Sequence, residues 1–322
     1  MLSTLNDRDR NFVLALYAAD LANSNTILCR AIKSGTIKGY LRAAASFSMA
    51  AQRLDPQLDI YGRRSSYINK VLLEVKRWES MPNRREPVTP EMMLHMVKNR
   101  SSRTNSLSSA LTDWNIAGQY LGQRLSEWAL TNYATSVPLT KKGDCIPFRF
   151  DDLIFVGNGK KNLRQPRSVQ LLVSEVSAVY VRWKVQKNGD NGQRILFTKN
   201  KKNLVLCPVR ALLRIRERAR RLKLAANVPL AVFTDDDGKT NYIWAKHIEQ
   251  HLRTVAKEVY DIDDADELKR WSPHSIRVGA AVRLHTAGKD GPYIQLRLRW
   301  RSMTFMVYLR NTVEIADQQH VA

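Results

Sequence analysis

Apolar residues recur at helical spacing through the N-terminal part of the chain. Leu14 and Leu21, Ile37 and Leu41, and Ile68 and its neighbours form three such series, each fitting one face of a helix. No repeat or low-complexity tract interrupts them. The pattern predicts helices over 9–22, 36–51 and 66–79.

The helical pattern stops at a segment with two prolines among charged residues. Residues 81–87 show no apolar periodicity, which is typical of a linker between domains. Thr89 and Pro90 then resemble the N-cap and first turn of a new helix. The chain is therefore predicted to have a helical first domain over 1–83 and a second domain over 84–322.

The second part mixes helical and strand patterns. Asn and Gly residues at 188–192 lie between apolar runs and indicate a β-hairpin. The fold class expected is mainly α with a small antiparallel β-sheet. The remaining predicted helices cover 110–133, 208–222, 242–259, 273–287 and 302–312, and the strands cover 146–156, 178–185 and 195–197.

Composition adds a partner class to this picture. The 322 residues are 44% hydrophobic, enough for two folded domains. Lys and Arg outnumber Asp and Glu by 52 to 30, giving a net charge of +22, which predicts a polyanionic partner such as double-stranded DNA. No apolar run approaches the ~18–20 residues of a membrane span, so no membrane partner is expected. The isolated Cys29, Cys145 and Cys207 predict reduced thiols, and neither a metal nor a cofactor is expected.

Two separated segments carry candidate chemistry. His274 and Arg277 lie three residues apart and would share one helix face, while Arg124 is followed three residues later by Glu127, which could orient it. Cleavage of a phosphodiester gathers negative charge on phosphate oxygens, and a guanidinium meets that charge with paired hydrogen bonds. Each preorganised donor could contribute roughly 3 kcal/mol. Tyr308 is the candidate nucleophile, and a nearby guanidinium pair would favour its phenolate form.

A proton donor for the departing sugar oxygen is also needed. Lys187, at the tip of the predicted hairpin, is the preferred candidate. Lys184 lies three residues earlier, and Lys160 and Lys161 follow a Gly-Asn-Gly turn that could be the relevant hairpin instead.

Together these residues resemble a known family, the tyrosine recombinases or phage integrases. The matching set is Gly122-x-Arg124-x-Ser126-Glu127, Lys187, His274-Ser-Ile-Arg277, Trp300 and Tyr308. The resemblance implies a two-domain clamp around duplex DNA, in which the first domain (1–83) binds DNA and the second (84–322) is catalytic. It also implies a 3′-phosphotyrosine intermediate and no need for ATP or metal. It also implies a tetramer assembled on two DNA sites, with a dimer at each site.

The resemblance also implies residue roles. Arg124 and Arg277 would hold the scissile phosphate, His274 would act as base or hydrogen-bond donor, and Trp300 would replace the more common histidine as an N–H donor. Arg299 stands where a glycine usually precedes that position. The predicted DNA-binding residues are Lys38, Arg42, Arg297, Arg299 and Arg301.

Within the family, segments 186–192, 206–212 and 300–310 are most similar to recombinases of eukaryotic DIRS and Crypton mobile elements. That likeness implies integration of a mobile element and a nuclear location; otherwise cytoplasm or nucleoid is expected. Three other interpretations stay open. They are a type IB topoisomerase, a catalytically silent DNA-binding protein derived from a recombinase, and a basic helical protein whose motif is accidental.

Overall fold

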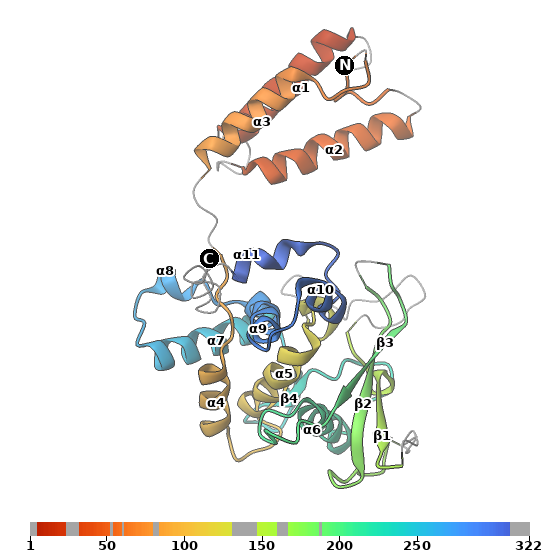
Figure 1. The fold of residues 1–322 in the computed structure, drawn as a ribbon, viewed down its shortest axis with the longest axis vertical. Coiled ribbons are helices and arrows are strands. Elements are labelled where there is room, and N and C mark those ends of the chain that lie inside the picture. The colour runs from red at the N-terminus through yellow and green to blue at the C-terminus, as the bar shows by residue number, and fades with distance from the viewer. Residues whose placement is uncertain are drawn as a thin grey trace. The chain divides into compact units, whose positions relative to one another are not determined.

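The computed structural model describes residues 5–23, 32–51, 54–59, 61–79, 84–130, 147–159, 167–186 and 189–309. The chain divides into two compact units, Met1–Pro82 and Asn83–Ala322 (Figure 1). None of the described helices is both long and apolar enough to cross a membrane.

The first unit contains the three helices that apolar spacing predicts. They are α1 (Asp7–Ala22), α2 (Ser34–Ala50) and α3 (Ser66–Trp78). Leu14 of α1, Ile37 and Leu41 of α2, and Ile68 and Leu72 of α3 form one buried cluster. The predicted apolar faces are therefore the faces that pack together.

The second unit is mainly helical and carries two small antiparallel sheets, which confirms the expected fold class (Figure 1). The three-stranded sheet has the order β1-β2-β3, and β4 pairs with β5. Its helices are α4 (Pro90–Lys98), α5 (Leu107–Leu121), α6 (Pro208–Arg221), α7 (Ala245–Tyr260), α8 (Ala265–Leu268), α9 (Pro273–Thr286), α10 (Gly291–Leu298) and α11 (Met306–Leu309). Its strands are β1 (Leu153–Gly157), β2 (Val176–Trp183), β3 (Gln193–Thr198), β4 (Val232–Thr234) and β5 (Thr240–Tyr242).

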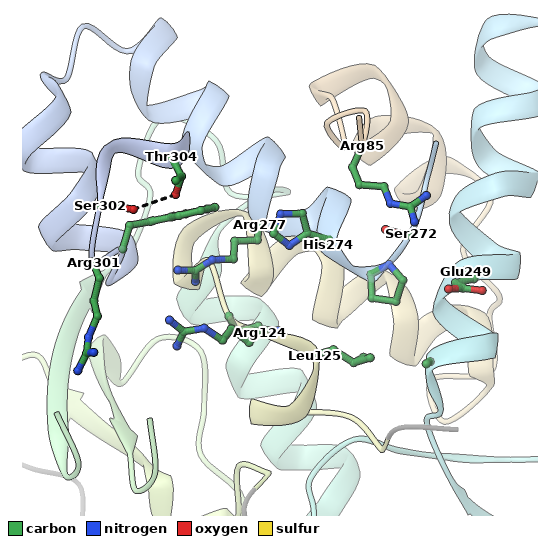
Figure 2. A pocket seen from close by; sticks show the side chains of 14 residues that line it. Arg85, Arg124, Leu125, Glu249, Ser272, His274, Arg277, Arg301, Ser302 and Thr304 are labelled. Atoms are coloured by element: carbon green, nitrogen blue, oxygen red, sulfur yellow. Dashed lines mark hydrogen bonds between the residues drawn. The ribbon is translucent and has the colours of Figure 1, made fainter. Parts of the chain in front are cut away.

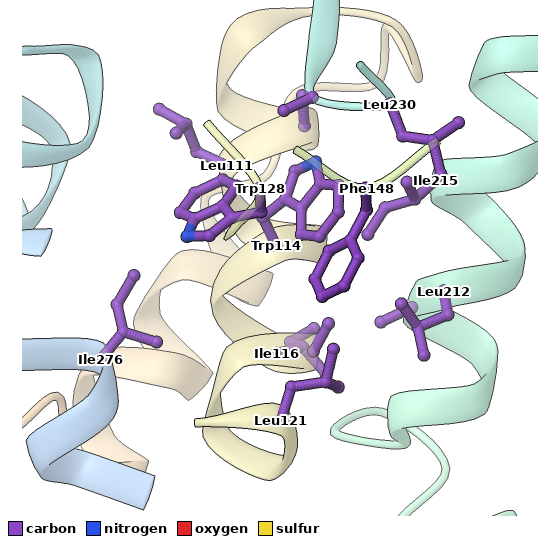
Figure 3. Packing of buried hydrophobic residues seen from close by; sticks show 14 of the residues in the cluster. Leu111, Trp114, Ile116, Leu121, Trp128, Phe148, Leu212, Ile215, Leu230 and Ile276 are labelled. Atoms are coloured by element: carbon purple, nitrogen blue, oxygen red, sulfur yellow. The ribbon is translucent and has the colours of Figure 1, made fainter. Parts of the chain in front are cut away.

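Helix α5 is the centre of this unit. Most of its residues are buried, and it packs against α4, α6, α7 and α9. Aromatic rings pack around its middle: Trp114 stacks on Trp128 with ring centroids 4.9 Å apart (Figure 3). Next to them, Phe148 meets Trp183 edge-on at 5.5 Å. This packing holds the segment that follows α5 in place, because Trp128 of that segment stacks on Trp114.

Several sequence expectations differ from the structure in detail. The strand predicted from 146 begins at Leu153, after a short 3₁₀ helix over Phe150–Asp152. The helix predicted to run to 133 ends at Leu121, because Gly122 takes the left-handed conformation (φ 53°) that closes a helix. The helix predicted from 242 begins at Ala245, since the preceding residues pair as β5. Helix α10 was not predicted, although Asp290 accepts a hydrogen bond from Tyr293 N as its N-cap.

Candidate active site

A cavity of about 610 Å³ in the second unit collects basic side chains from distant parts of the chain. We call it the arginine pocket. Arg124 follows α5, His274 and Arg277 belong to α9, and Arg85 and Arg301 lie on two further segments (Figure 2). Residues 150 positions apart in sequence thus face one space, as the paired motifs predict.

Arg124 is placed by the turn that ends α5. A Cβ on Gly122 would approach Leu298 Cδ2 to 2.7 Å, so the chain passes closely under α10 here. Glu127 Oε2 accepts the backbone N–H of Arg124 at 2.9 Å, and its Oε1 accepts from Arg124 Nη1 at 3.0 Å. The contact predicted between Arg124 and Glu127 is present, and it fixes both ends of the arginine.

Arg277 enters the pocket from the first turns of α9. Its side chain is 3% exposed, and its Nη1 donates to the Gly122 carbonyl while Nη2 donates to the Arg299 carbonyl at 3.4 Å. The guanidinium carbon lies 4.5 Å from the centre of the Trp300 ring, a cation–π distance. Trp300 therefore supports Arg277 by packing.

Tyr308 lies beside His274. Its hydroxyl is 3.3 Å from His274 Nε2, and the two rings are 5.7 Å apart. Trp300 also lines the pocket. Its indole nitrogen is buried and has no hydrogen-bond partner among the described residues. A buried donor without an acceptor is costly, so a ligand oxygen there would satisfy it.

Electrostatics mark the pocket as an anion site. Burial, then the charges of Arg277 and Arg85, lower the pKa of His274 to about 4, so its imidazole is neutral near pH 7. Burial, then Arg124 and Arg299, lower the pKa of Arg277 to about 9. An anion bound between these positive charges would reduce the repulsion between them.

The lysine assignment stays a prediction. Lys187, Lys160 and Lys161 lie outside the described residues. Lys184 is described, and its Nζ is 3.0 Å from Asp152 Oδ2 with the lysine side chain 12% exposed. That ammonium is engaged in a nearly buried ion pair, which disfavours Lys184 as the mobile proton donor.

The predicted DNA-binding residues differ in exposure. Arg42 and Arg301 are exposed, while Lys38 and Arg297 are half-buried. Arg297 also donates a hydrogen bond to the Leu196 carbonyl at 2.8 Å.

Arg299 requires a correction, because it is 4% exposed and its guanidinium binds Glu127 rather than facing the surface. Clustering of charge in sequence does not tell which way a side chain points.

Sequence reasoning also missed Arg85, which lines the pocket and acts on the charge of His274. It lies in the stretch interpreted as a linker, and no spacing pattern marks it. The described residues contain no cluster of three or more His, Cys, Asp or Glu side chains that could hold a metal ion.

Comparisons with known proteins give structural likenesses only. No protein-family model matches the chain, and no curated protein matches it. Among solved structures, the Tn1549 transposon integrase in complex with transposon right-end DNA has 17% identity and a TM-score of 0.48, covering 98% of this chain and 85% of that one. XerH recombinase bound to its difH substrate has 11% identity and a TM-score of 0.47, covering 98% and 70%. XerA recombinase has 14% identity and a TM-score of 0.40, covering 99% and 85%.

Proposed function

We propose that this chain cleaves and rejoins DNA strands through a covalent phosphotyrosine at Tyr308. The observation that carries the proposal is the contact of the Tyr308 hydroxyl with His274 Nε2 at 3.3 Å, one helical turn from Arg277 in the arginine pocket. A neutral base and two guanidinium groups thereby line one space of phosphate-binding character, and the potential nucleophile contacts that base.

The two arginines would hold the scissile phosphate. Arg124 reaches the pocket from the segment that follows α5, and Arg277 reaches it from α9. Both donate to the same carbonyl, that of Arg299, at 3.5 and 3.4 Å. This shared anchor keeps the two positive charges close before substrate arrives. Their preorganisation would stabilise the charge that develops on the non-bridging oxygens, each by roughly 3 kcal/mol.

The bond changes balance without a cofactor. The Tyr308 oxygen attacks phosphorus, its proton passes to His274, and the bond from phosphorus to the sugar oxygen breaks. That oxygen takes a proton from a general acid, for which Lys187 is the candidate. Attack of a 5′-hydroxyl on the phosphotyrosine reverses these steps, rejoins the strand and frees the tyrosine.

The bound phosphate would also prepare the base. A neutral imidazole with a pKa near 4 accepts protons poorly. A phosphate beside Arg277 adds negative charge near His274 and raises its pKa, because it offsets the arginine charges that lower it. Substrate binding therefore makes His274 a better acceptor for the Tyr308 proton.

Duplex DNA is the substrate class that the charge favours. The chain carries +22, and the exposed Arg301 lines the pocket, where neighbouring phosphates would lie. Lys38 and Arg42 of the first unit would add backbone contacts. Assembly as a tetramer is a proposal that follows from the resemblance to tyrosine recombinases. Integration of a mobile element and a nuclear location are proposals that follow from the DIRS and Crypton resemblance.

The test is formation of a denaturant-stable protein–DNA complex. Nicked duplexes tiled across the DNA that flanks the coding sequence serve as suicide substrates, and a relaxation assay on unrelated supercoiled plasmid runs beside them. Wild-type protein should form the complex, Tyr308→Phe should bind DNA without forming it, and Tyr293→Phe, on α10 with 43% exposure, should behave as wild type.

The outcomes separate the interpretations. Relaxation of plasmid without dependence on a specific duplex would indicate a type IB topoisomerase. Binding of duplex with no covalent complex at any site would indicate a silent DNA-binding protein. A covalent complex that persists in Tyr308→Phe would refute the assignment of the nucleophile.

A further inference from the structure

Arg299 occupies an unusual position in the second unit. It ends α10 in the left-handed conformation (φ 58°), which side chains other than glycine adopt at a cost of roughly 1–2 kcal/mol. It is nevertheless a large charged residue with 4% exposure. A strained, buried arginine beside the arginine pocket calls for a role that glycine could not perform.

The Arg299 side chain makes a bidentate ion pair with Glu127. Nη1 and Nη2 donate to Glu127 Oε1 and Oε2 at 3.1 and 3.0 Å, and Nη1 also donates to Gln186 Oε1 at 3.0 Å. The guanidinium carbon lies 4.0 Å from the centre of the Trp183 ring. Arg299 thus joins the carboxylate beside Arg124 to the root of the β2–β3 hairpin, where Gln186 lies.

The charges explain why this pairing matters. Glu127 is 5% exposed; burial alone would raise its pKa, but Arg299 and then Arg124 hold the pKa below its usual value. Glu127 is therefore a carboxylate close to both guanidinium groups. If Arg299 were absent, the negative charge of Glu127 would be balanced by Arg124, which it contacts directly, and by the nearby Arg277, and a buried ion pair of that kind binds strongly.

We infer that Arg299 is a positioning residue that neutralises Glu127, so that the charge of Arg124 stays available to a phosphate in the pocket. Glu127 then orients Arg124 through one oxygen without consuming its charge. The Arg299 carbonyl adds a second effect, since it anchors Arg124 and Arg277 together. Where cleavage is measured, this inference rests on the proposed function; where phosphate binding is measured, it does not.

The decisive variants are Arg299→Gly, Glu127→Gln and the double variant. Glycine keeps the left-handed backbone and its carbonyl but removes the counter-charge. Glutamine keeps the shape of Glu127 but removes its charge. If Arg299 acts through that charge, the double variant recovers what Arg299→Gly loses, whereas a merely structural role gives two losses that add.

The first readout is the rise in melting temperature of the full chain with inorganic phosphate at constant ionic strength. Wild type should show a rise that Arg277→Ala removes, Arg299→Gly should show little, and the double variant should regain most of it. The second readout is the rate of covalent complex formation, which should fall about 10- to 100-fold in Arg299→Gly and recover in the double variant.

Arg218→Ala is the matched control, because Arg218 is 2% exposed and pairs with the buried Asp113 away from the pocket. It should lower the melting temperature without changing its response to phosphate. Absence of a phosphate response in wild type, an unaltered response in Arg299→Gly, or no recovery in the double variant overturns the inference. If the double variant recovers the phosphate response but wild type forms no covalent complex with DNA, the inference is supported and the proposed function is refuted.

Discussion

Protonation of His274 gives the most quantitative prediction. Burial, followed by the charges of Arg277 and Arg85, places its pKa at about 4, against 6.5 for a free imidazole. The unfolded chain therefore binds a proton between these values that the folded chain does not. The contribution to stability is fully present above pH 6.5 and is lost progressively as pH falls toward 4.

The size of the loss follows from the two pKa values. Between about pH 7.5 and about pH 5 the linkage relation gives about 2 kcal/mol, which partial exposure of the ring reduces to about 1–2 kcal/mol. Denaturant unfolding of wild type and His274→Asn at both pH values measures it, because the variant lacks this titration. Equal pH dependence in the two proteins would refute the reasoning.

A direct measurement uses the imidazole itself. NMR titration of the histidine side chains should show His274 titrating near 4 without ligand, and at least about one pKa unit higher with bound inorganic phosphate. His251 is the matched control: burial lowers its pKa to about 4 as well, but it does not line the pocket. If phosphate leaves His274 unchanged, or shifts both histidines equally, the pocket does not hold the anion beside His274.

Three further predictions concern packing, buried charge and DNA affinity. Gly118→Ala should cost about 1–3 kcal/mol in thermal unfolding, because the new Cβ would lie 2.3 Å from Ile276 Cγ2; Gly35→Ala, with nothing within 4 Å, should cost nothing. Asp113→Asn should cost about 3–5 kcal/mol, since Arg218 and two other arginines would lose their buried counter-charge. DNA affinity measured by fluorescence anisotropy should fall steeply with salt, and a flat response would contradict an electrostatic interface.

Most helices could be predicted because their apolar faces repeat at helical spacing. Helices α1, α2, α3, α6 and α9 lie where the pattern placed them. The end of α5 could not be located this way, since a left-handed glycine closes the helix while apolar residues continue beyond it. Strand β5 was not predicted for a related reason: its pairing with β4 is a tertiary contact that local apolar spacing does not encode.

The candidate site was predictable where residue type and spacing both constrain chemistry. The meeting of His274, Arg277 and Arg124 in one pocket and the Glu127 contact follow the sequence motifs. The role of Arg299 could not follow from them, because its charge suggested a surface contact whereas the fold directs it inward to Glu127. The orientation of the Arg299 side chain depends on the left-handed turn that ends α10.

The central claim is that the Tyr308 oxygen becomes bonded to DNA. The most direct test is mass spectrometry of the peptide that stays attached to a trapped suicide substrate after protease and nuclease digestion. The account predicts a nucleotide remnant on Tyr308, bound through a 3′-phosphate. A remnant on any other residue, or a 5′-phosphate linkage, would contradict it.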